Sequence, residues 1–169
     1  MTDIVRPVTA YRLPVRVRFH ECDPLGHVNN AVYLNWLEQA AIDHAALVGW
    51  SQENLERAVG GVFVARRHEI DYLRPAYEGD HLEVLTWPNS MQMATALRRY
   101  VIRRAAEPNG TPDLIEDPDI TALTSGEVLV QAVTRWALVS LDPVRPLRIP
   151  KRVIDTFIES VDATEGEQP

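Results

Sequence analysis

Residues 19–50 read FHECDPLGHVNNAVYLNWLEQAAIDHAALVGW, and this stretch contains the most hydrophobic helix that the sequence predicts. A strand is expected to end near the acidic residue Asp23, and the turn sequence PLGH follows it. Asn29 or Asn30 is suited to cap the next helix by accepting a hydrogen bond from a first-turn N–H. The helix, expected over residues 31–48, is apolar nearly all round and is therefore predicted to be buried on most faces.

A carboxylate and an imidazole, those of Asp23 and His27, stand at the predicted N-terminus of this helix. Helix N-termini present unpaired N–H groups with a positive partial charge, so the N–H groups of Asn30, Ala31 and Val32 are suited to bind an oxyanion. Asp23 is suited to attack a carbonyl carbon directly or to act as a general base for water. The sequence leaves both mechanisms open. The alternative is that Asp23 has no catalytic role and only forms the turn, since Asp-Pro commonly starts turns.

The rest of the chain predicts an antiparallel sheet. Apolar and polar residues alternate as in half-buried strands, and the expected strands cover residues 11–22, 62–73, 81–87, 91–104 and 127–141. Consecutive strands joined by short turns, such as a turn at 88–90, pair as antiparallel neighbours. One such sheet around one buried helix predicts an α+β fold.

We expect one domain over residues 11–160. Residues 1–10 are predicted to form a flexible lead, and the polar residues 161–169 a disordered tail. Residues 105–126 are rich in Pro, Asp and Glu and predict a long hairpin loop. A short amphipathic helix is expected within residues 151–160.

Composition narrows the class of protein. The net charge of −7 argues against broad nucleic-acid binding, and the single cysteine, Cys22, fits a reducing compartment. The N-terminus lacks the apolar core of a secretory signal, and no apolar run approaches the roughly 18–20 residues that span a membrane. We therefore expect a cytoplasmic protein without nucleic-acid or membrane partners. No Cys/His pattern predicts a metal site.

Several blocks of the sequence resemble the hotdog-fold acyl-CoA thioesterases of the 4-hydroxybenzoyl-CoA thioesterase-like family. The matching residues are Arg18-Phe19, the block DPLGHVNN at 23–30, Tyr33-Leu34, Glu38, the block EIDYLRPA at 69–76, Gly79-Asp80 and the segments 126–136 and 145–150. The resemblance covers roughly residues 11–155. It implies an antiparallel sheet of about five strands wrapped around a long central helix. It also implies a homodimer, or a dimer of dimers, with active sites at the subunit interface.

The implied activity is hydrolysis of an acyl-CoA or acyl-carrier-protein thioester without a metal. Coenzyme A enters as part of the substrate, so no resident cofactor is expected. In the resembled family, the acidic residue at the position of Asp23 is catalytic. His27 is expected to orient Asp23, to bind water or to hydrogen-bond a carbonyl. Some plant acyl-carrier-protein thioesterases of this fold have an Asn where this chain has Leu25, which argues against an Asp-Asn-His constellation.

Supporting residues are expected around Asp23 and His27. Asn29 and Tyr33 stand at the start of the helix, and Glu38 lies two turns into it. A buried carboxylate needs a partner, so Glu38 is expected to hydrogen-bond across the dimer or to flank the site.

Coenzyme A carries phosphates, so an acidic protein needs local positive charge to bind it. The main candidates are Arg66, Arg67, Arg98, Arg99 and Arg103, and a further basic cluster is formed by Arg145, Arg148, Lys151 and Arg152. The alternative for each residue is a solvated charge on the face of a strand.

Two other functions remain open. One is a hotdog module that binds acyl-CoA without catalysis, in which Asp23 serves only the turn. The other is an enoyl-CoA hydratase of the same fold, a group that has an Asp and a His five residues apart with an Asn between them. Here Asp23 and His27 are four apart and the Asn is absent, which argues against that enzyme.

Overall fold

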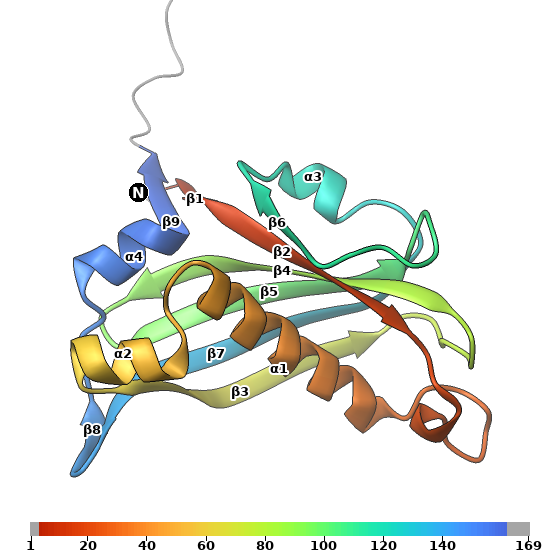
Figure 1. Cartoon of the computed structure of the whole chain (residues 1–169), viewed down its shortest axis with the longest axis horizontal. Helices are drawn as coiled ribbons and strands as arrows, with labels where there is room; N and C mark the ends of the chain where they lie inside the picture. Colours follow the sequence, from red (N-terminus) through yellow and green to blue (C-terminus); the bar gives the residue numbers. More distant parts are fainter. Residues whose placement is uncertain (1–3, 162–169) are drawn as a thin grey trace, which may run out of the picture.

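The computed structural model describes residues 4–161, in which one curved antiparallel sheet packs against one long helix (Figure 1). The sheet has seven strands in the order β3-β7-β5-β4-β2-β6, with β8 paired to β7. Its strands are β2 (Thr9–Arg16), β3 (Val62–Tyr72), β4 (His81–Gln92), β5 (Thr95–Arg104), β6 (Asp113–Glu116), β7 (Val128–Leu141) and β8 (Val144–Pro146). The predicted α+β fold is confirmed, and the five expected strands gain β6 and β8.

The helices are α1 (Asn30–Leu47), α2 (Gln52–Val59), α3 (Ile120–Leu123) and α4 (Lys151–Phe157), and a 3-10 helix, η1, covers Phe19–Glu21. Among the described residues, no helix is both long enough and apolar enough to cross a membrane. Ser51 accepts a hydrogen bond from the Asn54 N–H and so caps α2. A separate pair of strands, β1 (Ile4–Pro7) and β9 (Ile158–Val161), joins the two ends of the described chain.

Helix α1 buries one face against the sheet. Its buried residues are Tyr33, Trp36, Leu37, Ala40, Ala41 and His44, and most of them join the main core with alternate residues of β4 and β5. The opposite face is open, since Ile42 and Leu47 are each 59% exposed. The prediction that α1 is buried on most faces is therefore wrong for a single chain, because only one layer of sheet covers it.

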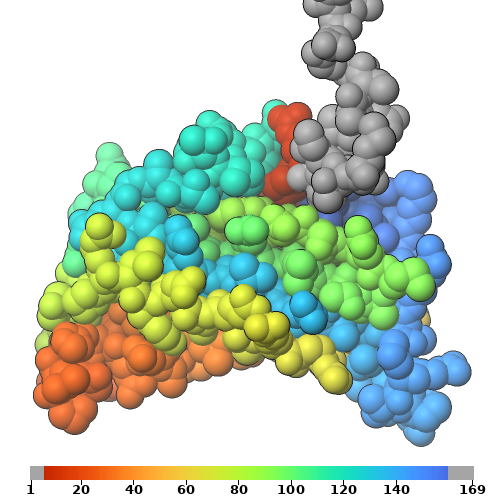
Figure 2. Space-filling view, turned by 180° about the vertical axis from the view of Figure 1, so that it is seen from behind, coloured from red at the N-terminus to blue at the C-terminus, as the bar shows by residue number. Residues whose placement is uncertain are grey.

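The segment 105–126 is an ordered cover rather than a simple hairpin loop. It contains β6, which pairs with β2, and α3. Leu123 of α3 packs with Leu85, Trp87 and Val101 on the sheet face that points away from α1. Figure 2 shows the molecule from the side of this face. Successive strand residues point to opposite faces, so the sheet has a core on each side. The loop prediction missed this second core because its partners lie on distant strands.

The ends of the domain also differ from the prediction. Residues 1–10 were expected to be a flexible lead, but residues 4–7 form β1 and β2 begins at Thr9. Val161 belongs to β9, and the rest of the predicted tail, 162–169, lies outside the described residues. The helix expected in 151–160 ends at Phe157, because the next residues pair with β1.

The turn predicted at residues 88–90 is wrong. Strand β4 continues through these residues with a register shift between Pro88 and Ser90, and the chain reverses at Met93, whose φ is 55°. A β-bulge accommodates the proline within the strand, so the residue does not end it.

Candidate active site

Backbone hydrogen bonds hold the loop between η1 and α1 at both of its ends. Cys22 and Val28 form an antiparallel bridge. The Asn29 N–H donates to the Glu21 carbonyl at 2.9 Å, and the Val28 N–H donates to the Ala76 carbonyl at 2.9 Å. The loop therefore sits between the 3-10 helix, the start of α1 and the turn that follows β3.

Asp23 uses one carboxylate oxygen to hold this loop. Its Oδ1 accepts a hydrogen bond from the Leu25 N–H at 2.8 Å, and its carbonyl accepts one from the Gly26 N–H at 2.9 Å. Gly26 has φ +85°, a conformation that other residues adopt with strain. The second oxygen, Oδ2, has no hydrogen-bond partner among residues 4–161. It is therefore available to a substrate or a water molecule.

His27 does not orient the Asp23 carboxylate. The two residues are joined through the backbone, where the Asp23 N–H donates to the His27 carbonyl at 2.8 Å. Within the described part of the chain, no hydrogen bond or ion pair links the two side chains. The His27 ring instead packs edge-on against Tyr77, with 5.8 Å between ring centroids. Of the three roles expected for His27, orienting Asp23 is wrong, because the Leu25 N–H performs that task. That His27 binds water or hydrogen-bonds a carbonyl stays a prediction.

The N-terminus of α1 has one free N–H group of the three that were predicted to bind an oxyanion. Asn29 is the N-cap, and its Oδ1 accepts from the Ala31 N–H at 2.9 Å. The Asn29 carbonyl accepts from the Val32 N–H at 2.9 Å. In the described structure the Asn30 N–H has no such partner. The oxyanion prediction is therefore corrected to Asn30 alone, because capping already satisfies Ala31 and Val32.

Two adjacent tyrosines hydrogen-bond to backbone near the loop, and one of them, Tyr72, fixes Asn30. The Tyr72 hydroxyl donates to the Asn30 carbonyl at 3.0 Å, and the Tyr33 hydroxyl accepts from the Ala76 N–H at 3.2 Å. The two rings pack edge-on at 5.5 Å. Burial raises the pKa of Tyr33 and of Tyr72, so both hydroxyls keep their protons at neutral pH. The prediction singled out Tyr33 but missed Tyr72, whose only signal is its place in the EIDYLRPA block.

Glu38 lies away from Asp23. It is two turns into α1, about 12 Å along the axis from Asn30. Its side chain is 45% exposed, with Oε1 4.0 Å from Nε2 of His68 on β3. A carboxylate nearer the loop is that of Glu21, which accepts hydrogen bonds from the Trp36 indole at 3.3 Å and the Arg18 N–H at 2.7 Å. Sequence reasoning missed Glu21, because its partners become visible only in the fold.

The predicted phosphate-binding arginines divide into three groups. Arg66 and Arg67 are exposed on β3, and Arg67 pairs with Glu69 at 2.9 Å. Arg99 is exposed on the opposite side of the sheet from α1 and donates to the Asn89 side chain at 2.9 Å. These three stay open to solvent.

Arg103 and Arg98 do not fit the prediction. Arg103 pairs with Glu83 at 2.7 Å and donates to the carbonyl of Ala122 at 2.7 Å, so it holds the inserted segment against the sheet. Arg98 is 6% exposed and points toward α1. Both are wrong as surface phosphate ligands, because the alternation of β5 places each side chain in a packed layer.

Comparison with known proteins gives consistent results. Residues 17–112 match the thioesterase-like superfamily. The chain is 29% identical over 151 residues to the acyl-CoA thioester hydrolase YbgC of Escherichia coli, covering 88% of this chain and 96% of that protein.

Solved structures of thioesterases share the fold at lower identity. An Asp-to-Asn mutant of 4-hydroxybenzoyl-CoA thioesterase complexed with 4-hydroxybenzoyl-CoA has a TM-score of 0.70 and 17% identity, over 87% of this chain and 97% of that one. A putative oleoyl thioesterase from Lactobacillus plantarum has a TM-score of 0.71 and 18% identity, over 88% of this chain and 50% of that one. These structures confirm the predicted hotdog fold.

Proposed function

The chain belongs to the thioesterase-like superfamily, and on this premise we propose that it hydrolyses an acyl-CoA thioester to the free acid and coenzyme A. One observation carries the proposed site. The free Oδ2 of Asp23 lies on the short loop that leads into α1, and the free N–H of Asn30 is at the first residue of that helix. Together they supply a base or nucleophile and an electrophilic group, which are the two parts that acyl transfer needs.

In the general-base route, Oδ2 of Asp23 takes a proton from water as the water oxygen attacks the thioester carbonyl carbon. Negative charge then develops on the carbonyl oxygen, where the Asn30 N–H and the positive end of α1 stabilise it. The C–S bond breaks as the carbonyl re-forms, and the thiolate of coenzyme A leaves and is protonated. In the nucleophilic route, Oδ2 attacks the carbonyl carbon, the C–S bond breaks and the thiolate of coenzyme A leaves and is protonated. Water then hydrolyses the mixed anhydride, which releases the acid and regenerates the Asp23 carboxylate. Either route proceeds without a metal or a resident cofactor.

The decisive experiment compares wild type with Asp23→Asn on a panel of acyl-CoAs, with a thiol reagent that detects released coenzyme A. Asparagine retains an oxygen for the Leu25 N–H but is neither a base nor a nucleophile. We expect kcat to fall at least about 100-fold, as loss of a general base commonly causes. Asp155→Asn is the matched control, because Asp155 pairs with Lys151 on the surface of α4. Equal activity of Asp23→Asn and wild type would remove Asp23 from the mechanism, and tight acyl-CoA binding without release would favour the non-catalytic module.

We also propose that the enzyme is a homodimer formed through β3. This strand is at the edge of the sheet and spans residues 62–72, and long open edges are templates for pairing. Two copies of β3 paired antiparallel would extend the sheet across both subunits and bring Glu38, Arg66 and Arg67 to the interface. The open face of α1, with Ile42 and Leu47, is suited to join two dimers. Sedimentation at assay concentration tests this, and a fully active monomer would refute it.

The reaction is proposed to take place in the cytoplasm. Cys22 is a free thiol, which fits a reducing compartment. Arg66 and Arg67 remain the proposed contacts for the phosphates of coenzyme A, because they are exposed and lie on the proposed dimer edge. Replacing both with glutamine is expected to raise KM for acyl-CoA while leaving kcat nearly unchanged, since the phosphates lie far from the reacting carbonyl.

A further inference from the structure

A cavity lies toward the other end of α1 from Asp23. It has a volume of about 160 Å³ and sits between the C-terminal half of α1, α2 and the ends of β4, β5 and β7. Its Ala45 is about four helical turns from Asn30, which is about 22 Å along the axis. Most of its lining is apolar, and the large side chains are those of Trp50, Leu55, Phe63, Met91, Trp136 and Phe157.

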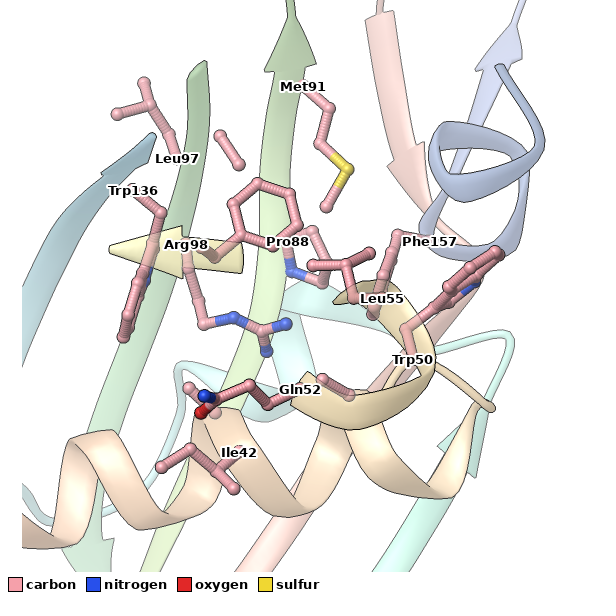
Figure 3. A pocket seen from close by; sticks show the side chains of 14 residues that line it. Ile42, Trp50, Gln52, Leu55, Pro88, Met91, Leu97, Arg98, Trp136 and Phe157 are labelled. Atoms are coloured by element: carbon pink, nitrogen blue, oxygen red, sulfur yellow. The ribbon is translucent and has the colours of Figure 1, made fainter. Parts of the chain in front are cut away.

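One charged group points into this apolar cavity. Figure 3 shows the guanidinium of Arg98 extending between the labelled side chains toward Gln52. Arg98 is only 6% exposed. Its Nη1 donates to Nδ1 of His44 at 2.8 Å and to the Thr86 hydroxyl at 3.3 Å, and the guanidinium lies 5.8 Å from the Phe157 ring centre.

Every partner of Arg98 in the described structure is neutral. Arginine is only a donor, so Nδ1 of His44 accepts, and the proton on the ring is at Nε2, which donates to the Thr9 hydroxyl at 2.8 Å. Burial and the neighbouring Arg98 lower the pKa of His44 to about 2, so its ring is uncharged. No carboxylate of residues 4–161 lies within the 4.0 Å of an ion pair with Arg98. A buried cation without a counter-charge is costly, and an anion in the cavity would remove that cost.

The geometry of the guanidinium indicates which anion fits. Nε and Nη2 make no hydrogen bond to the described residues, and this edge of a guanidinium matches the two oxygens of a carboxylate. The size of the cavity indicates the rest of the ligand. An apolar cavity of about 150 Å³ in another protein holds benzene, so this one accommodates an aromatic ring or a short alkyl chain.

We propose that this cavity binds a small apolar carboxylate, with its carboxylate on Arg98 and its body against Trp50, Trp136 and Phe157. A carboxylic acid of this class is what thioester hydrolysis releases. The identification of the ligand as the reaction product rests on the proposed function. The cavity would then be a second site, which holds the product acid away from Asp23.

Calorimetric titration of the wild type with benzoate and hexanoate tests the proposal, with benzamide and hexanamide as uncharged analogues of the same shape. We expect saturable binding of the carboxylates and at least tenfold weaker binding of the amides. Trp50 and Trp136 line the cavity, so their fluorescence should change over the same concentration range.

Three variants locate the bound acid. Arg98→Gln removes the buried charge and should raise Kd for benzoate at least tenfold. Ala45→Phe fills the cavity from α1 and leaves Arg98 in place, so it should also raise Kd for benzoate at least tenfold. It provides the test if Arg98→Gln does not fold. Arg135→Gln is the matched control, because it removes an exposed charge from β7 and should leave Kd unchanged.

The proposal is overturned if folded wild type shows no saturable binding, if the amides bind as well as the acids, or if Ala45→Phe binds like wild type. Asp23→Asn should bind benzoate with wild-type affinity, and loss of binding there would place the acid at the catalytic loop instead. None of these titrations uses a thioester. Their failure therefore leaves the hydrolase proposal intact, and loss of the hydrolase proposal leaves the binding result interpretable.

Discussion

The two ends of α1 differ in how they hold a charge. At the N-terminus, Asp23 lies on an open loop, and the backbone N–H of Leu25, two residues away, holds its carboxylate. Toward the C-terminus, Arg98 is buried among the side chains of His44, Thr86 and Phe157, which come from three other elements. The first arrangement leaves a reactive atom accessible to substrate. The second buries a charge whose hydrogen bonds form only when the whole domain is folded.

This contrast separates activity from stability. A change at Asp23 should affect the reaction and leave the core intact, because the residues that follow it in the loop, 24–26, are exposed. Changes around Arg98 and His44 should affect the free energy of unfolding, because their hydrogen bonds lie inside the core.

Asp23→Asn is expected to have the largest effect. A loss of at least about 100-fold in kcat corresponds to about 2.7 kcal/mol of transition-state stabilisation. The free energy of unfolding in urea should change by no more than about 0.5 kcal/mol, as for other surface positions. A large loss of stability with little loss of kcat would show that the loop carboxylate is structural.

Acid should destabilise the protein through His44. The pKa of His44 is about 2 in the folded protein, below its ordinary value of 6.5, so below pH 6.5 the unfolded chain binds a proton that the folded chain does not. The stabilisation is complete above pH 6.5 and is lost as the pH falls, by about 1.4 kcal/mol for each pH unit. Urea unfolding at pH 6.5 and pH 5 should therefore differ by about 2 kcal/mol from this residue.

His44→Gln supplies the control for that measurement. Glutamine can accept from Arg98 and donate to Thr9, but it does not titrate. The other group stacked on the ring, Tyr11 at 6.2 Å, keeps its proton throughout this pH range, because burial and the neighbouring Asp43 raise its pKa. The variant should lose the extra acid dependence, and equal pH dependence of the two proteins would contradict the assignment.

Removing the cap of α1 should have an intermediate effect. Asn29→Ala deletes the acceptor for the Ala31 N–H and should lower the free energy of unfolding by about 1 kcal/mol. Ser51→Ala deletes the corresponding cap of α2 and should cost a similar amount. Only Asn29→Ala should also lower kcat, because only that cap adjoins the Asn30 N–H. Equal kcat values in the two variants would argue against an oxyanion site there.

Tyr72→Phe should have the smallest effect. It removes the hydrogen bond to the Asn30 carbonyl, and a single such bond contributes about 0.5–1.5 kcal/mol, at the low end for an exposed side chain. Tyr77→Phe is the matched control, since the described residues offer its hydroxyl no hydrogen bond. Kinetics and unfolding of both variants should show a small loss for Tyr72→Phe alone. A change of the same size in both would mean that the hydroxyl of Tyr72 does not position Asn30.

The sequence predicted the first end of α1 much better than the second. The turn and helix after Asp23 follow from local rules, since a proline, a glycine and a capping asparagine act within a few residues of one another. The strand expected to reach residue 22 is wrong at its end, because β2 stops at Arg16 and the 3-10 helix Phe19–Glu21 leads into the loop. The role of His27 and the choice among Asn30, Ala31 and Val32 were not predictable in this way. They depend on which N–H groups capping already satisfies, and on the packing of His27 against Tyr77.

By itself, the sequence determined the α+β class, the central helix and the catalytic candidate Asp23, because alternation, turn residues and caps are written in neighbouring positions. The tertiary structure alone decided that Arg98 is buried beside His44, that Arg103 holds the inserted segment, and that this segment covers a second core. Those contacts join residues far apart in the chain. The energies of these contacts depend on burial and on whether the neighbouring groups are neutral or charged. Neither can be predicted from the pattern of adjacent residues.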